Sequence, residues 1–148
     1  MPAVVEANAL RALTIWQPWA DAVAYLGKDV ENRTWRTSYT GLLLVHAALR
    51  VDQAAMTQMP AGLPGVRGAV IATARITGCH NECDGSCSEW AEPGLWHWQI
   101  TDVRPLDTPV TATGVQRLWI PDAALRARVA AVTTSSPRRS NTEGSAAP

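Results

Sequence analysis

The segment from Leu13 to Trp35 constrains the fold more than any other part of the 148-residue sequence. Its first residues alternate between apolar and polar, which is typical of a strand buried on one face. Gln17 and Pro18 then break the strand, and proline is favoured at the start of a helix because its missing N–H would be unpaired there. Apolar residues recur at helical spacing from Trp19, and Gly27 follows as a helix terminator. The segment therefore predicts a strand, a tight corner, a short helix and a second strand.

Charged residues follow the predicted helix and lead into its second strand. Lys28 is the only lysine, and the other basic residues are twelve arginines. A lone lysine here serves either as a general acid/base or phosphate contact, or as a solvated charge near the helix C-terminus. Glu31 and Arg33 are two residues apart, so they share one face of a strand. They form either an ordinary salt pair or part of a site.

Length and composition predict one globular domain. Hydrophobic residues make up 47% of the chain, and no apolar run approaches the length of a membrane span. The N-terminal residues do not resemble a secretion signal, so we expect a cytoplasmic protein. The formal net charge is zero, which argues against strong non-specific binding to duplex DNA. Arginines between Arg33 and Arg75, with acids gathered between Glu82 and Glu92, still permit a local basic face.

Seven tryptophans and no phenylalanine must supply most of the aromatic packing. Aromatic rings also stack on unpaired bases. We consider Trp16 and Trp98 as candidates for such stacking, with packing in the core or at its rim as the alternative for each.

The middle and end of the chain read as further strands and two helices. Gly41–Ala47 is a continuous apolar strand, and His46 near its end is either a satisfied core residue or a ligand-facing group. The other predicted elements are a helical segment at 52–59, a loop at 60–68, strands at 69–77, 95–103 and 108–113, and a helix at 122–132. Pro105 is expected to end the strand at 95–103, and Asp122 to cap the last helix.

Three cysteines and a histidine occur between Cys79 and Cys87, with the spacing C-H-x2-C-x3-C. Such residues raise the question of zinc. Cys79 and His80 are adjacent and cannot easily reach one tetrahedral ion together, and no second cysteine pair occurs elsewhere. We therefore expect free cysteines, no metal and no other cofactor; a disulfide is not expected in a reducing cytoplasm.

Several motifs in a fixed order resemble the ASCH domain. They are QPW-A from Gln17, GK-x-V-E-N-R-x-W from Gly27, Y-x-G-x-L-L-V-H-A from Tyr39, and the closing run from Trp96 to Trp119. The resemblance covers about Leu10 to Pro121. It implies an α+β fold, a small PUA-like mixed β-barrel flanked by short helices. The expected organisation is a flexible lead at 1–9, a domain at 10–132 with its core at 10–121 and its C-terminal helix at 122–132, and a disordered tail at 133–148.

The resemblance also implies a module that binds RNA or a modified nucleobase in a cleft beside the Lys28–Arg33 strand. Arginine can contact a phosphate or a guanine edge, and a carboxylate can accept from an exocyclic amine. We expect no membrane association, and the sequence does not predict the oligomeric state. The residues expected to bind the ligand are Trp16, Gln17, Lys28, Glu31, Asn32, Arg33, His46 and Trp98.

Two alternatives remain: a hydrolase acting on RNA or a nucleoside, and a protein-interaction domain. One branch similar to this family removes the acetyl group of N4-acetylcytidine with a lysine, a threonine nucleophile and an arginine. Lys28 and Arg33 match that pattern, but Glu31 stands at the threonine position, and a carboxylate is a poor nucleophile for an amide. Glu31 would then be a general base, with Lys28 stabilising an oxyanion. Another branch is thought to cut RNA, for which Lys28, Arg33 and Tyr39 are candidates.

Overall fold

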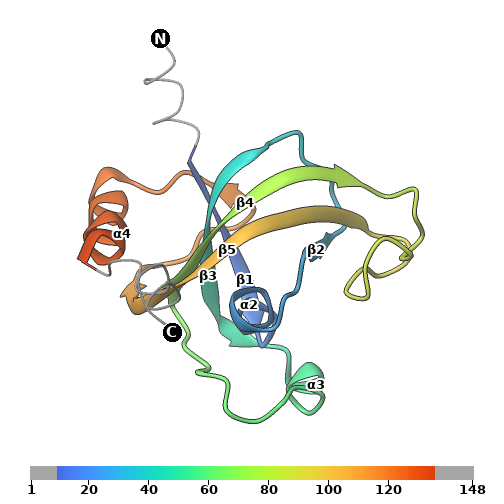
Figure 1. Ribbon diagram of the computed structural model, residues 1–148, viewed down its shortest axis with the longest axis horizontal. Coiled ribbons are helices and arrows are strands. Elements are labelled where there is room, and N and C mark those ends of the chain that lie inside the picture. The colour runs from blue at the N-terminus through green and yellow to red at the C-terminus, as the bar shows by residue number, and fades with distance from the viewer. Residues whose placement is uncertain (1–9, 136–148) are drawn as a thin grey trace, which may run out of the picture.

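A computed structural model describes residues 10–135 of the chain. Six strands form one curled sheet in the order β2-β5-β4-β3-β1-β6 (Figure 1). The predicted lead at 1–9 lies outside the described residues, as does the predicted tail from residue 136 onward. The strands are β1 (Arg11–Gln17), β2 (Val30–Arg33), β3 (Gly41–Val51), β4 (Ala69–His80), β5 (Trp96–Thr111) and β6 (Leu118–Trp119), and the helices are α2 (Trp19–Tyr25), α3 (Gln53–Met56) and α4 (Ala123–Ser135).

The predicted fold class is confirmed: the structure is an α+β fold built on a small curled sheet. β1 pairs with β3 in parallel, and the other pairings are antiparallel. The apolar strand β3 lies inside the sheet between β4 and β1, which explains why its residues 43–48 are buried. Within residues 10–135, no helix has the length and apolar character needed to span a bilayer.

Two clusters of buried side chains form the core. The larger one joins α2 to β1, β3, β4 and β5, and it includes Trp98. The smaller one seats α4 on the sheet through Leu125 and Val129, which pack with Leu106 and Val110 of β5. Helix α4 and the loop at 81–95 consequently lie at opposite ends of the sheet (Figure 1).

The opening segment has the predicted order of strand, corner, helix and strand. Gln17–Pro18 is a cis peptide at the corner, and Gly27 after α2 has a positive φ of 76°, as a helix-terminating glycine requires. The cap of the last helix is also confirmed, since the Asp122 carboxylate accepts a hydrogen bond of 2.8 Å from the Leu125 N–H. That helix continues through Ser135, three residues beyond its predicted end. Helix α3 covers four residues, fewer than the predicted 52–59.

The prediction that Pro105 ends a strand is wrong. β5 is continuous from Trp96 to Thr111, and Pro105 is paired with Ala72 of β4. The physical reason lies on the other side of β5, where β2 pairs only with residues 96–99. Beyond them β5 is an edge within the described sheet, and an edge strand tolerates a proline because no neighbour needs its missing N–H. The predicted strands at 95–103 and 108–113 are therefore one strand.

Candidate functional site

A buried ion-pair network joins the end of α2 to β2. The Lys28 Nζ donates to Glu31 Oε1 at 2.9 Å and to the Val30 carbonyl at 2.6 Å. The Arg33 guanidinium contacts Glu31 Oε2 from the same strand face, with Nε at 3.1 Å and Nη2 at 3.0 Å. Lys28 is only 3% exposed and Glu31 7%. The interpretation of Lys28 as a solvated charge is therefore wrong, because the side chain is buried and its ammonium group forms an ion pair with Glu31.

Arg33 also reaches across the sheet. Its Nη2 donates to the main-chain carbonyl of Thr14 in β1 at 3.0 Å. In the sheet order, β2 and β1 are separated by three strands, so this contact exists only because the sheet curls back on itself. Arg33 thus lies where the two sides of the curled sheet approach each other.

A large cavity of about 1160 Å³ opens beside this contact. It is lined by β1, β3 and the segment that follows β5, and it contains Arg33, Arg50, Arg117 and Arg128. No aspartate or glutamate is among its described lining residues. Because the whole chain has no net formal charge, this cavity concentrates positive charge locally.

Two tryptophans line the same cavity, each beside an arginine. The Arg50 guanidinium lies 5.0 Å from the ring centroid of Trp16, and the Arg117 guanidinium lies 4.4 Å from that of Trp35. Such cation–π contacts orient both groups. Trp16 is 44% exposed, so its ring presents an accessible apolar face at the cavity wall.

His46 forms part of the cavity floor and has one unused polar atom. The ring is 1% exposed, and its Nε2 lies 2.7 Å from the Ala112 carbonyl, to which it donates. This assigns the ring proton to Nε2 and leaves Nδ1 as an acceptor, which is buried without a hydrogen-bond partner. Burial lowers the pKa of His46, and its hydrogen bond to Ala112 opposes this only in part. The His46 ring is therefore uncharged near neutral pH. Its Nε2 donates to Ala112, and its Nδ1 is an acceptor in the wall of the cavity.

A smaller cavity of about 420 Å³ lies on the other side of Glu31. Lys28, Glu31 and Asn32 line it together with Trp19 and the segment 89–92. The ion-pair network thus separates two cavities, with Lys28 at the smaller and Arg33 at the larger. Of these two cavities, the catalytic candidates Lys28 and Glu31 line the smaller one.

Four predicted site residues have structural roles instead. Gln17 is buried, and its amide bonds to Asp21 and to the Val66 carbonyl. Asn32 uses both ends of its amide to hold the 81–95 loop.

Trp98 and Tyr39 are the other two predicted site residues that have structural roles. Trp98 is fully buried against Trp35, so it cannot stack on a ligand, and that interpretation is wrong. The Tyr39 hydroxyl donates to the Leu42 carbonyl, and the ring lines none of the cavities described here.

The larger cavity contains residues that the sequence analysis did not place in the site. They are Trp35, Arg50, Arg117 and Arg128. Arg50 lies in the stretch between Arg33 and Arg75, and the excess of arginines over acids in that stretch was the one sequence signal for a basic cavity. Arg117 and Arg128 are distant in sequence from β1 and reach the cavity only through the curled topology.

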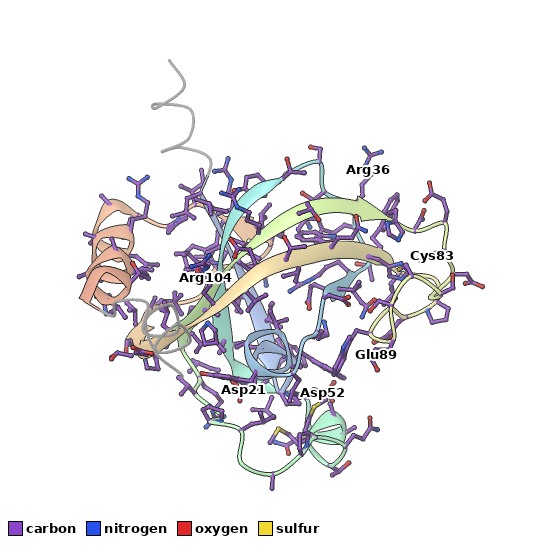
Figure 2. The ribbon with its side chains drawn as sticks, in the orientation of Figure 1. Asp21, Arg36, Asp52, Cys83, Glu89 and Arg104 are labelled. Carbon is purple, nitrogen blue, oxygen red and sulfur yellow. The ribbon has the colours of Figure 1, made fainter. Side chains whose placement is uncertain are left out.

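A third group of reactive side chains lies at the far end of β4 and β5. The ligating atoms of His80, Cys83, Cys87 and His97 all lie within 4.8 Å of one another. Partial burial raises the pKa of the Cys83 thiol, but hydrogen bonds with Cys87, with the backbone and with His80 outweigh this and lower that pKa to about 6. Figure 2 shows Cys83 where the 81–95 loop meets the sheet.

The overall shape has close counterparts among solved structures. An ASCH protein from Zymomonas mobilis superposes with a TM-score of 0.61, over 84% of this chain and 96% of that one, at 12% identity. The chain has the fold of an ASCH domain. A serine-to-alanine variant of the same protein gives a TM-score of 0.60 over 85% and 97%, and a tyrosine-to-phenylalanine variant gives 0.60 over 84% and 98%, both at 12% identity. No protein-family model matches the sequence, and no curated protein matches it.

The ASCH fold accounts for the arrangement described above, since its curled sheet brings the ends of β1, β3 and β5 around one cavity. At 12% identity the superposition shows that the two proteins share a fold, and it shows nothing about a shared function. The function depends on the residues that this chain places on the fold.

Proposed function

We propose that this ASCH-fold protein binds single-stranded RNA, or a nucleobase within it, in the larger cavity. The observation that carries the proposal is the collection of four arginines and two tryptophans around one cavity whose described lining residues include no carboxylate. Arginines contact the phosphate backbone, and exposed aromatic rings stack on bases irrespective of sequence.

Different residues of the cavity would contact different parts of the bound RNA. Arg50 and Arg117 lie at exposed positions and would contact phosphates, because their cation–π partners orient them without consuming their N–H donors. Trp16 offers an open ring face for a base. The buried Nδ1 of His46 would accept a hydrogen bond from an amine or hydroxyl of the bound group, which removes the cost of leaving it unpaired.

Binding is tested by fluorescence anisotropy with labelled single-stranded RNA, single-stranded DNA and duplexes at several salt concentrations. Arg50→Gln and Arg117→Gln should each weaken RNA binding and reduce the salt-dependence slope by about 0.7, the value for one phosphate contact on a single strand. The matched control is Arg104→Gln, which removes the same charge from an exposed arginine paired with Asp102.

Affinity that is absent for every nucleic acid, or lost equally in Arg104→Gln, would contradict the proposal. Binding of free nucleosides with no dependence on salt would assign the cavity to a nucleobase alone and leave the arginines without a phosphate to contact.

A hydrolase is the second candidate, favoured by the buried Lys28–Glu31 pair at 2.9 Å beside the smaller cavity. Both Glu31 oxygens already accept hydrogen bonds from cations, which favours a structural role for this carboxylate over that of a general base. Incubation with RNA and N4-acetylcytidine, followed by product separation, distinguishes the two candidates. Products that disappear in Glu31→Gln, while binding persists, would replace the binding proposal by the hydrolase.

A further inference from the structure

The cluster at the far end of β4 and β5 belongs to neither cavity. His80 is the last residue of β4, and His97 is the second residue of β5. They are direct partners in the antiparallel ladder, which brings their side chains close on one face of the sheet. Their ring centroids are 5.6 Å apart. The loop between the two strands adds Cys83 and Cys87.

The distances among these side chains approach those of a tetrahedral metal site. Cys83 Sγ lies 3.1 Å from His97 Nδ1 and 2.9 Å from Cys87 Sγ, and Cys87 Sγ lies 3.7 Å from the same nitrogen. Tetrahedral Zn²⁺ with bonds of about 2.3 Å to sulfur and about 2.0–2.1 Å to nitrogen separates its ligand atoms by about 3.3–3.8 Å. Side-chain shifts of less than about 1 Å would therefore complete the coordination.

His97 is held in the form that a metal ligand needs. Its Nε2 lies 2.7 Å from the Glu92 carbonyl, the hydrogen-bond acceptor, while Nδ1 faces the two thiols. Donation from Nε2 places the ring proton there and leaves Nδ1 with a lone pair, an arrangement that supporting hydrogen bonds impose on zinc-bound histidines. The His97 side chain is fully buried, so this orientation is fixed by packing as well.

Hydrogen bonds hold the loop at 81–95, among them the one that the Glu92 carbonyl accepts from His97. None of its fifteen residues is fully buried, so hydrophobic packing contributes little to its position. Its described anchors include the two hydrogen bonds of Asn32 and the hydrogen bond from Ser88 to Asp29. Long loops without secondary structure need such fixed points because ordering them costs conformational entropy. A metal bound to two loop cysteines and two strand histidines would supply one more.

We propose that His80, Cys83, Cys87 and His97 form a structural zinc site that fastens the 81–95 loop to the ends of β4 and β5. The two thiols lose their protons to solvent, and the resulting thiolates balance the 2+ charge of the ion, so no redox change is involved. Four protein ligands leave no open coordination position, as in structural sites. Cys79, adjacent to His80, packs against the core cluster and does not take part.

The site would also shape the smaller cavity. The loop places Trp90 and Glu92 against Asn32, and both residues line that cavity beside Lys28. Loss of the metal should therefore loosen the loop while the core clusters, which contain no loop residue, stay intact.

The test uses the full chain, purified without added metal and again after supplementing the growth medium with zinc. Metal content is measured by elemental mass spectrometry, and Co²⁺ added to the metal-free protein reports tetrahedral thiolate coordination by its visible absorption. The compared variants are Cys83→Ser, Cys87→Ser and the matched control Cys79→Ser. Circular dichroism establishes which variants are folded.

We expect a single zinc ion per chain in the parent protein and in Cys79→Ser, and a loss of most bound zinc and of the Co²⁺ absorption in the other two variants while they remain folded. Hydrogen exchange should rise in the loop after chelation. A parent protein that binds neither ion, that keeps Cys83 and Cys87 as a disulfide under reducing conditions, or that loses metal equally in Cys79→Ser would overturn the proposal.

Discussion

Arg33 in β2 donates a hydrogen bond of 3.0 Å to the main-chain carbonyl of Thr14 in β1, although three strands separate β2 from β1 in the sheet. The same guanidinium contacts the buried Glu31 through two nitrogens. One side chain therefore joins the ion-pair network to the closure of the curled sheet and lines the larger cavity.

Replacing Arg33 by lysine should destabilise the protein although the charge is kept. A lysine has a single ammonium group and cannot match the planar fork that serves Glu31 and Thr14 together. Loss of a hydrogen bond from a charged group costs about 1.5–3 kcal/mol. Urea unfolding measures the change, with Arg104→Lys as the control because Arg104 is exposed and pairs with the exposed Asp102. Equal effects in the two variants would show that the bridge to Thr14 adds nothing.

Lys28→Met should destabilise the fold more strongly than Arg33→Lys. The change removes one partner of an ion pair in which Lys28 is 3% exposed, and Glu31 then keeps only Arg33. Breaking a buried pair in this way costs about 3–5 kcal/mol. The double variant Lys28→Met/Glu31→Gln should lose more stability than Lys28→Met, since it also removes the carboxylate partner of Arg33. A double variant as stable as Lys28→Met would contradict this account.

The stability of the fold should depend on the protonation of His46. Burial lowers its pKa in the folded state below the ordinary value of 6.5, so the folded protein binds fewer protons than the unfolded chain at mildly acid pH. By linkage, the free energy of unfolding then falls as pH drops from 6.5 through the lowered pKa, and the full contribution is present above 6.5.

The measurement is the pH dependence of urea unfolding for the parent protein and for His46→Gln. The glutamine amide can replace the donor to Ala112 but does not titrate. The difference between the two curves should show stability lost toward acid in the parent only. Parallel curves would mean that His46 does not titrate across this range, and the other two histidines cancel in the comparison.

Local sequence signals were sufficient where neighbouring residues determine the structure. The corner at Pro18 and the cap at Asp122 follow from the preferences of single residues, and the shared face of Glu31 and Arg33 follows from strand geometry. The prediction for Pro105 was wrong because the preferences of proline do not show which part of a strand has a hydrogen-bonded neighbour strand.

The composition of both candidate sites depended on contacts between distant residues. His97 lies ten residues after Cys87, and only the pairing of β4 with β5 sets it opposite His80. Arg117 likewise reaches Trp35 through the return of the chain after β5. Strand register and sheet curvature are set by packing across the whole domain, so spacing along the chain could not identify these partners.

Trp16→Ala should weaken RNA binding without a comparable loss of stability. The ring is 44% exposed at the larger cavity, so little core packing is removed. Stacking on a base contributes about 1–3 kcal/mol, which corresponds to a roughly 5- to 150-fold rise in the dissociation constant. Trp90→Ala is the matched control because Trp90, of these two cavities, lines the smaller one. If Trp90→Ala alone weakens binding, the ligand occupies the smaller cavity.

Gly114→Ala should fill the part of the larger cavity next to Nδ1 of His46, the ring nitrogen that can accept a hydrogen bond. A methyl group at this position would lie 2.8 Å from His46 Cε1, 2.9 Å from Thr14 Oγ1 and 3.1 Å from His46 Nδ1. Neither neighbour can retreat freely, since His46 is bonded to Ala112 and the Thr14 hydroxyl accepts from Trp119 and donates to Val115. We expect a loss of about 1–3 kcal/mol from overpacking, together with weaker ligand binding.

Gly78→Ala is the control for the added methyl group. There the nearest atom, at 2.6 Å, is the end of the exposed Gln99 side chain, which can rotate away. Thermal unfolding and RNA anisotropy of both variants separate crowding at His46 from a general effect of replacing glycine in this fold. Gly114→Ala with unchanged affinity would show that the ligand does not reach Nδ1, and the base would then have to lie nearer Trp16 and Arg50, at the outer part of the cavity.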